Sequence, residues 1–96
     1  MTFYVYILQS QVNNSFYKGS TDDLVRRLRE HNEGKSAFTK KYAPWNLVWY
    51  TLKDGRAEAV RLEIKLKNLS IERLIEFMKK YPAPTNPVTL SKLIQP

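Results

Sequence analysis

Two uncharged stretches rich in aromatic and β-branched residues, 3–8 and 45–52, most constrain what this chain can fold into. Such residues favour strands. The segments around the two stretches are charged and carry apolar residues three and four positions apart, which is typical of helices. This alternation predicts a small α+β domain.

The composition limits the classes of protein that remain. A chain of 96 residues is long enough for one domain, which we place at 1–80, followed by a Pro-rich tail at 81–96. The sequence has 0 Cys, which excludes disulfide scaffolds, zinc fingers and thiol nucleophiles. The apolar run at the amino terminus is far shorter than the roughly 18 residues of a membrane span, and we expect a cytoplasmic location.

The net charge indicates an anionic partner. With 16 Lys and Arg against 9 Asp and Glu, the chain carries a formal charge of +7. Nucleic acid is the commonest partner of such a chain, because basic side chains release counterions from phosphate. A basic protein without such a partner is the alternative, and composition alone leaves both open.

The amino-terminal pattern predicts a β-hairpin. Residues 3–8 and 15–20 have strand composition, and the adjacent Asn13–Asn14 pair tolerates the positive φ of a tight turn. With a two-residue turn there, Leu8 faces Gly19 across the ladder. One face of the hairpin then receives Tyr4, Tyr6, Tyr17 and Gly19.

The remaining segments predict three helices and a strand. The first helix is expected at 22–33, with Ser20 and Asp23 as a capping box and Gly34 as its stop. The uncharged stretch that begins at Trp45 is expected to form a strand covered on both faces. The other expected elements are a loop over 34–44, a helix over 56–69 capped by Asp54, and a helix from Ser70 to near Lys80.

Tyr6 and Tyr17 are the first candidates for chemistry. A phenol has a pKa near 10, but a neighbouring cation or metal can lower that pKa and make the phenol a proton acceptor. The alternative is that both are sheet aromatics whose hydroxyls face water.

Asp23, Arg27 and His31 are spaced four apart and are therefore expected on one face of the first helix. A guanidinium pairs with phosphate oxygens, and an imidazole exchanges protons near neutral pH. Together these groups suit phosphodiester chemistry. The alternative is a solvated charged face on which Asp23 complements the helix N-terminus.

Glu63 is the candidate metal ligand. Its helical neighbours are mainly apolar, and an unpaired carboxylate is expensive to bury. Mg²⁺ is commonly held by one or two carboxylates, with water and substrate phosphate completing its shell. A salt bridge to Lys67 is the alternative.

Basic residues interleaved with aromatic ones form a candidate contact surface. In the loop over 34–44, three lysines alternate with Phe38 and Tyr42. We expect the nucleic-acid-binding lysines to be Lys18, Lys35, Lys40 and Lys41.

Several of these residues together resemble a known family. Tyr4-Val5-Tyr6, Tyr17-Lys18-Gly19, Arg27, His31 and Glu63 resemble, in order and spacing, the motifs of the GIY-YIG nuclease domain. The likeness covers about residues 3–69 and is strongest to small stand-alone members related to the amino-terminal domain of the UvrC-like excinucleases. Tyr4 stands where the first motif of the family has its glycine.

The resemblance implies a small three-stranded antiparallel sheet flanked by about three helices. It also implies metal-dependent hydrolysis of phosphodiester bonds in DNA, in repair or processing. Tyr6 and Tyr17 would line the site, and one of them would help to deprotonate the attacking water. Arg27 would bind the scissile phosphate, and His31 would assist proton transfer or positioning. Glu63 would ligate one Mg²⁺ or Mn²⁺ ion.

Two other functions stay open at this stage. The first is a non-catalytic nucleic-acid-binding module that retains the fold and uses the basic and aromatic loop. The second is an adaptor that docks on another protein through its Pro-rich tail. A protein partner for targeting is compatible with each hypothesis.

Overall fold

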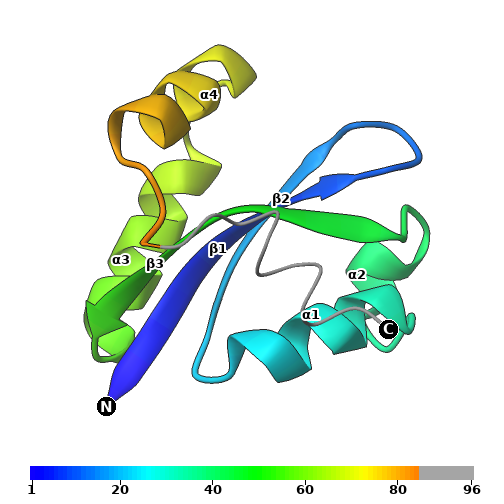
Figure 1. Ribbon diagram of the computed structural model, residues 1–96, viewed down its shortest axis with the longest axis horizontal. Coiled ribbons are helices and arrows are strands. Elements are labelled where there is room, and N and C mark those ends of the chain that lie inside the picture. Colours follow the sequence, from blue (N-terminus) through cyan, green and yellow to red (C-terminus); the bar gives the residue numbers. More distant parts are fainter. Residues whose placement is uncertain (85–96) are drawn as a thin grey trace.

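The computed structural model describes residues 1–84 as one antiparallel sheet with helices on both faces (Figure 1). The strand order is β2-β1-β3, so β1 is central and β2 lies at an edge. The elements are β1 (Thr2–Ser10), β2 (Phe16–Thr21), α1 (Leu24–Asn32), α2 (Ala37–Lys40), β3 (Trp45–Asp54), α3 (Arg56–Lys67) and α4 (Ile71–Lys80). The predicted α+β fold with a three-stranded antiparallel sheet is confirmed. Among residues 1–84, none of the helices is both long and apolar enough to cross a membrane.

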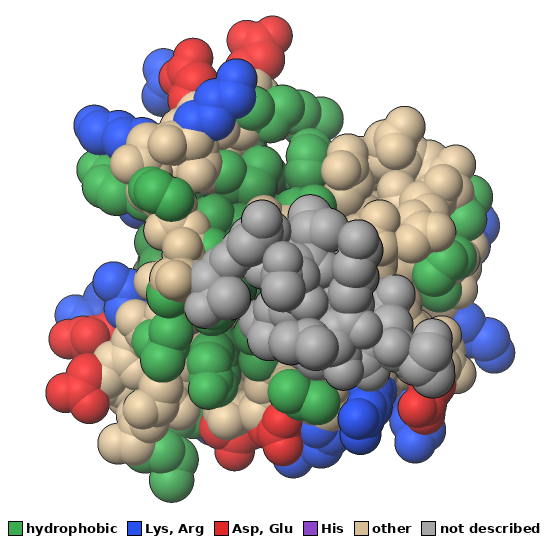
Figure 2. Space-filling view, in the orientation of Figure 1, with side chains coloured by type: hydrophobic (Ala, Val, Ile, Leu, Met, Phe, Trp, Pro, Cys, Tyr) green, Lys and Arg blue, Asp and Glu red, His purple; other side chains and the backbone are tan. Residues whose placement is uncertain are grey.

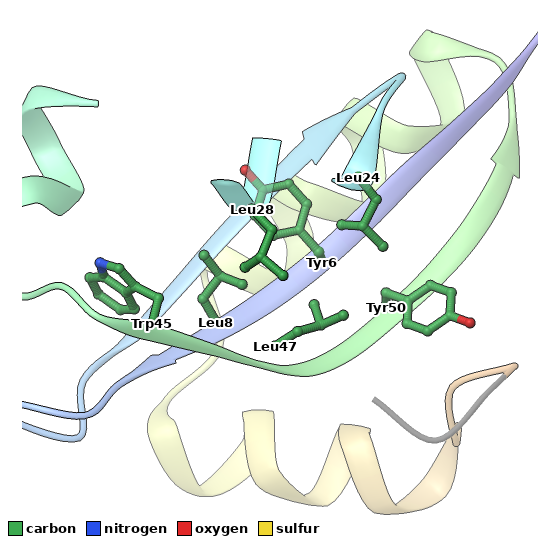
Figure 3. Packing of buried hydrophobic residues seen from close by; sticks show 7 residues of the cluster. All are labelled: Tyr6, Leu8, Leu24, Leu28, Trp45, Leu47 and Tyr50. Carbon is green, nitrogen blue, oxygen red and sulfur yellow. The ribbon is translucent and has the colours of Figure 1, made fainter. Parts of the chain in front are cut away.

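The central strand has a hydrophobic core on each face. Val5 and Ile7 point to the side of α3 and α4, while Tyr6 and Leu8 point to the side of α1. All four side chains are buried, as expected for a strand with helices on both sides. Figure 3 shows the core on the α1 side, which contains Tyr6, Leu8, Leu24, Leu28, Trp45, Leu47 and Tyr50.

The hairpin register differs by two residues from the predicted one. Gly19 pairs with Tyr6, and Leu8 pairs with Tyr17. The connection is a longer loop than predicted, in which the hydroxyl of Ser10 accepts hydrogen bonds from the backbone N–H groups of Val12 and Asn13. Since a shift of two preserves the alternation of faces, the prediction that Tyr4, Tyr6 and Tyr17 share one face is confirmed.

Two predicted helix caps are wrong. Asp23, not Ser20, caps α1, and its carboxylate accepts a hydrogen bond of 3.0 Å from the Arg26 N–H. Asp54 is the last residue of β3, where it pairs with Thr2, and so it does not cap α3. The N-cap position of α3 is occupied by Gly55. Among the described helices, side-chain oxygens cap the N-termini of α1, at Asp23, and of α4, at Ser70. The predicted start of α4 at Ser70 is therefore confirmed.

The other boundaries are close to those predicted. Gly34 has a φ of 76° just after α1, as the expected left-handed stop requires. The predicted loop over 34–44 is wrong in one respect, since it contains the short helix α2. The strand from Trp45 is covered on both faces, and a bulge opposite Ile7 and Leu8 turns Leu47 and Tyr50 toward the same core.

The carboxyl-terminal part of the described chain is attached to the sheet. The indole N–H of Trp49 donates a hydrogen bond of 2.6 Å to the carbonyl of Tyr81, and Ala83 packs against both cores. The predicted Pro-rich tail from 81 therefore begins in contact with the domain, and its residues 85–96 lie outside the described part.

Two arginines of α1 form ion pairs with nearby acidic side chains. Figure 2 shows side chains of both signs together along the lower edge of the molecule, where α1 lies. Arg26 forms ion pairs with Asp22 and Glu30, and Arg27 pairs with Glu30 as well. The outer face of this helix is therefore charged and exposed to solvent at Arg26 and Asp22.

Candidate active site

A chain of three polar side chains lies between the sheet and α1. The hydroxyl of Tyr6 is 2.9 Å from Nε2 of His31, and Nδ1 of His31 is 2.7 Å from the hydroxyl of Thr39. All three residues are buried. Both ring nitrogens therefore have a partner, and a neutral imidazole accepts on one side while it donates on the other.

The position of Tyr6 depends on a glycine in the neighbouring strand. A Cβ atom on Gly19 would lie 2.6 Å from the hydroxyl oxygen of Tyr6 and 2.7 Å from Cζ. The missing side chain lets the phenol cross over the edge strand β2 toward His31. Figure 3 shows the hydroxyl of Tyr6 pointing away from Leu47 and Tyr50, which keeps the polar end out of the apolar core.

Tyr17 places a second phenol beside the first. Its ring centroid lies 6.3 Å from that of Tyr6 and 4.9 Å from that of His31, in an edge contact. On its other side, Tyr17 contacts Phe38 of α2 with 5.7 Å between centroids. Tyr17 thus joins the buried tyrosine and histidine to the surface.

Arg27 supplies a cation next to the two tyrosines. Its guanidinium donates a hydrogen bond of 3.1 Å to Glu30, and it also interacts with the hydroxyl of Tyr6. The side chain is 31% exposed, so it is accessible to a ligand while held in place by two partners. A phosphate bound here would meet the planar donor group that suits it.

Glu63 reaches the same region from the opposite face of the sheet. One carboxylate oxygen accepts a hydrogen bond of 2.5 Å from Ser20 of β2, and the other lies 2.7 Å from the ammonium of Lys67. The side chain is 18% exposed. The salt bridge named as the alternative is therefore present, and it raises the pKa of Lys67 through the hydrogen bond with Glu63.

Burial sets the protonation states of the tyrosine and histidine. Burial raises the pKa of Tyr6 above its ordinary value of 10, and the neighbouring Tyr17 raises it further, whereas Arg27 acts in the opposite direction. Burial, assisted by the charge of Arg27, lowers the pKa of His31 to about 4. At neutral pH both groups are uncharged, so the pair is ready to pass a proton rather than to hold a charge.

The structure brings together five of the predicted site residues and leaves others apart. Tyr6, Tyr17, Arg27, His31 and Glu63 come from β1, β2, α1 and α3 and converge around the glycine in β2. Asp23 is the cap of α1 and takes no place among them. His31 is completely buried, so the alternative of a solvated face formed by Asp23, Arg27 and His31 is wrong.

The predicted nucleic-acid-binding lysines have different surroundings. Lys18 lies in β2 next to Tyr17, in the wall of a surface groove. Lys35 forms an exposed ion pair with Glu33, and Lys41 lies over the ring of Tyr42 at 5.6 Å. The stem of Lys40 lies beside Gly34.

Sequence reasoning missed Thr39 and the contact of Ser20 with Glu63. Thr39 is eight positions from His31 but belongs to a different helix, so periodicity does not predict their contact and only the folded chain joins them. The sequence pattern favours Ser20 as a helix cap, although its place in the strand after the glycine directs it to the α3 side. Phe38 belongs to the basic and aromatic loop that the sequence pattern already indicated.

A known protein family matches most of the chain. The family described as the GIY-YIG catalytic domain matches residues 2–75 of the chain. The protein therefore belongs to the GIY-YIG nuclease family, as the resemblance of its motifs implied.

Its relatives within that family are small proteins of similar length. A UPF0213 protein of Pediococcus pentosaceus is 33% identical over 79 residues, covering 81% of this chain and 82% of the relative. UPF0213 protein BH0048 of Halalkalibacterium halodurans is 39% identical over 71 residues, covering 73% of this chain and 74% of the relative. The solution structure of UPF0213 protein BH0048 from Bacillus halodurans superposes with a TM-score of 0.59 at 32% identity, covering 93% of this chain and 95% of that one.

Proposed function

We propose that this protein is a divalent-metal-dependent endonuclease that hydrolyses phosphodiester bonds in DNA, in repair or processing. The observation that carries the proposal is the convergence of two phenols, an imidazole, a guanidinium and a carboxylate around Gly19. Membership of the GIY-YIG family supports the reaction class.

The hydrogen bond between Tyr6 and His31 suggests how water is activated. As Tyr6 accepts the proton of the attacking water, it passes its own proton to Nε2 of His31, whose Nδ1 is held by Thr39. The charge of Arg27 opposes protonation of His31 in the free protein. A phosphate bound to Arg27 compensates that charge, so the imidazole becomes a better base when substrate is present.

Arg27 and Tyr17 are suited to hold the substrate. The guanidinium is half-buried and fixed by Glu30, so it is preorganised to bind the scissile phosphate and the charge that develops on it. The side chain of Tyr17 lies between the buried phenol and the surface groove, where it positions the strand and the attacking water.

The residues present fit a single divalent ion. Residues 1–84 contain no group of three or more His, Cys, Asp or Glu side chains gathered for a metal, but Glu63 with the Ser20 hydroxyl is an oxygen donor set of the kind Mg²⁺ uses with water and phosphate. When bound, such an ion would supply polarisation of the phosphate and stabilisation of the leaving oxygen. The ammonium of Lys67 contacts one of the two carboxylate oxygens of Glu63 and would compete with an ion for it.

Cleavage of a labelled panel tests the proposal. The panel contains duplex, single-stranded, flap and four-way-junction DNA together with RNA, each with Mg²⁺, with Mn²⁺ and with a chelator. We expect metal-dependent cutting, reduced at least about 100-fold by Arg27→Ala and by Glu63→Gln. Arg29→Ala and Glu58→Gln, exposed positions on the same two helices, are the matched controls and should cut normally.

The second candidate function is a nucleic-acid-binding module without catalysis. The ion pair between Glu63 and Lys67 favours it, since the carboxylate is already compensated by a side chain. Salt-sensitive binding with no cutting under any metal condition would support this function and contradict the nuclease. Full activity in both the Arg27 and Glu63 variants would contradict the assignment of the site.

A further inference from the structure

A groove of about 550 Å³ runs along the outer edge of β2. Its walls are three consecutive residues of that strand and one side chain each from α2 and α3, namely Phe16, Tyr17, Lys18, Phe38 and Lys67. The groove lies where the sheet ends, because β2 is an edge strand. Its size is within the range of pockets that hold small ligands.

Phe38 is the most unusual side chain in this groove. It is 79% exposed, although a phenylalanine normally gains stability by burial. The ring is supported on one side by Tyr17, with 5.7 Å between centroids and 48° between planes. An aromatic ring held in this way offers its other face to a flat ligand.

The charged residues that line the groove favour an anionic ligand. Lys18 and Lys67 are the charged residues of its wall, and no acidic residue of the described chain lines it. An acidic peptide satisfies the charge but makes no use of the aromatic ring. A paired base in a duplex is already stacked on both sides, whereas an unpaired nucleotide has both a phosphate and a free aromatic face.

The groove is continuous with the candidate active site. Tyr17 forms part of the groove and contacts His31, with 4.9 Å between ring centroids. Lys67 also lines the groove, and its ammonium lies 2.7 Å from the Glu63 carboxylate. A strand whose base occupies the groove therefore has its neighbouring phosphodiester beside the groups that would cleave it.

We propose that this groove binds an unpaired nucleobase next to the scissile phosphodiester, with Phe38 as the stacking surface and Lys18 and Lys67 facing the adjacent phosphates. The inference rests on the proposed function, since it names the form of nucleic acid that the same site accepts. It assigns to α2 a role in selecting strands with unpaired bases.

Binding measured with a chelator tests the groove without cleavage. The probes are a fluorescein-labelled 12-nucleotide single-stranded DNA, the same sequence as RNA, and the corresponding DNA duplex. We expect Phe38→Ala to weaken binding of the single strands about 5- to 100-fold and to leave duplex binding within about twofold of wild type. Phe38→Trp should retain the affinity, whereas Phe38→Leu, which is apolar but not aromatic, should lose it.

Other variants separate stacking from charge. Val12→Ala, at an exposed apolar position in the hairpin loop, is the control and should change nothing. Lys18→Gln should lower the salt dependence of binding to single strands and to duplex alike. If Phe38→Ala weakens binding of the RNA strand as much as that of the DNA strand, the base and not the sugar occupies the groove.

Three binding results overturn the inference: no binding of single strands by the wild-type protein, unchanged binding by Phe38→Ala, or an equal loss for single strands and duplex. These results are distinguishable from failure of the nuclease. A wild-type protein that binds single strands through Phe38 but cuts nothing refutes the nuclease alone. Cutting that Phe38→Ala leaves unchanged on every substrate refutes the groove alone.

Discussion

His31 shows how the environment of one residue alters what its sequence position predicts. Its spacing of four residues from Arg27 predicts a charged face, yet it is completely buried between Tyr6 and Thr39. Burial favours its neutral form, in which one ring nitrogen donates a hydrogen bond and the other accepts one.

Burial of His31 makes the stability of the protein depend on pH. Its pKa is lowered from 6.5 to about 4, so the unfolded chain binds a proton more readily than the folded one. The free energy of unfolding should therefore be unaffected above pH about 6.5 and should fall by up to about 3 kcal/mol as the pH decreases toward 4. Urea unfolding at pH 7.5 and pH 4.5 measures the effect.

His31→Gln is the control for this pH dependence, because glutamine does not titrate. The loss of unfolding free energy between pH 7.5 and pH 4.5 should be smaller in His31→Gln than in wild type, by most of the about 3 kcal/mol assigned to His31. An equal difference in both proteins would show that other groups cause the pH dependence.

At the scale of elements, the short helix α2 contributes to the site through Thr39. Thr39→Val removes the hydroxyl that contacts Nδ1 of His31 and leaves a buried nitrogen without that partner, whereas Thr39→Ser retains a hydroxyl. We expect Thr39→Val to lower the free energy of unfolding by about 1–3 kcal/mol and cleavage by at least about 10-fold. Nitrogen-15 NMR shifts of the imidazole should show a mixture of tautomers in Thr39→Val and one tautomer in Thr39→Ser and wild type.

If the serine variant loses as much activity as the valine variant, or the tautomer is unchanged in Thr39→Val, then Thr39 has only a packing role. The NMR readout makes this distinction, because a loss of packing alone does not move a proton between ring nitrogens.

The edge strand β2 depends on Gly19 in a different way. Gly19→Ala places a methyl group within 2.7 Å of two atoms of the Tyr6 side chain, which is confined by the core on the α1 side. We expect a loss of about 1–3 kcal/mol in the free energy of unfolding and loss of cleavage, since the ring must move away from His31. Chemical denaturation and the cleavage panel measure the two effects.

A Tyr6→Leu background tests the cause of this loss. With no aromatic ring above residue 19, adding the alanine should have almost no further effect on stability. A full loss in that background would mean that the strand itself, and not the ring, requires glycine.

At the scale of the whole molecule, the described chain continues to support the sheet beyond the last helix. The Trp49 indole donates to the Tyr81 carbonyl, and Ala83 packs against both cores. A chain ending at residue 80 should therefore unfold about 1–2 kcal/mol more easily than one ending at residue 84. Urea unfolding of the two chains compares them, and identical midpoints would place the end of the domain at 80, as the sequence predicted.

Much of the fold was accessible from the sequence because it depends on local patterns. The alternation of Tyr4 and Tyr6 gave the face of the first strand, and the change to helical spacing located the helices to within a few residues. The motif resemblance led to the family, which the comparison with known proteins confirmed. The hairpin register was missed because the hydroxyl of Ser10 fixes the loop, and periodicity does not contain that contact.

The sequence by itself determined the elements, the faces of the strands and the residues available for chemistry, since all of these follow from spacing along the chain. Only the tertiary structure decided which residues meet. Ser20 and Glu63 are 43 positions apart, and Tyr6 and His31 are 25 apart, yet each pair forms a hydrogen bond. Such contacts depend on how helices cross a sheet, and the burial they create changes the pKa values on which the proposed chemistry depends.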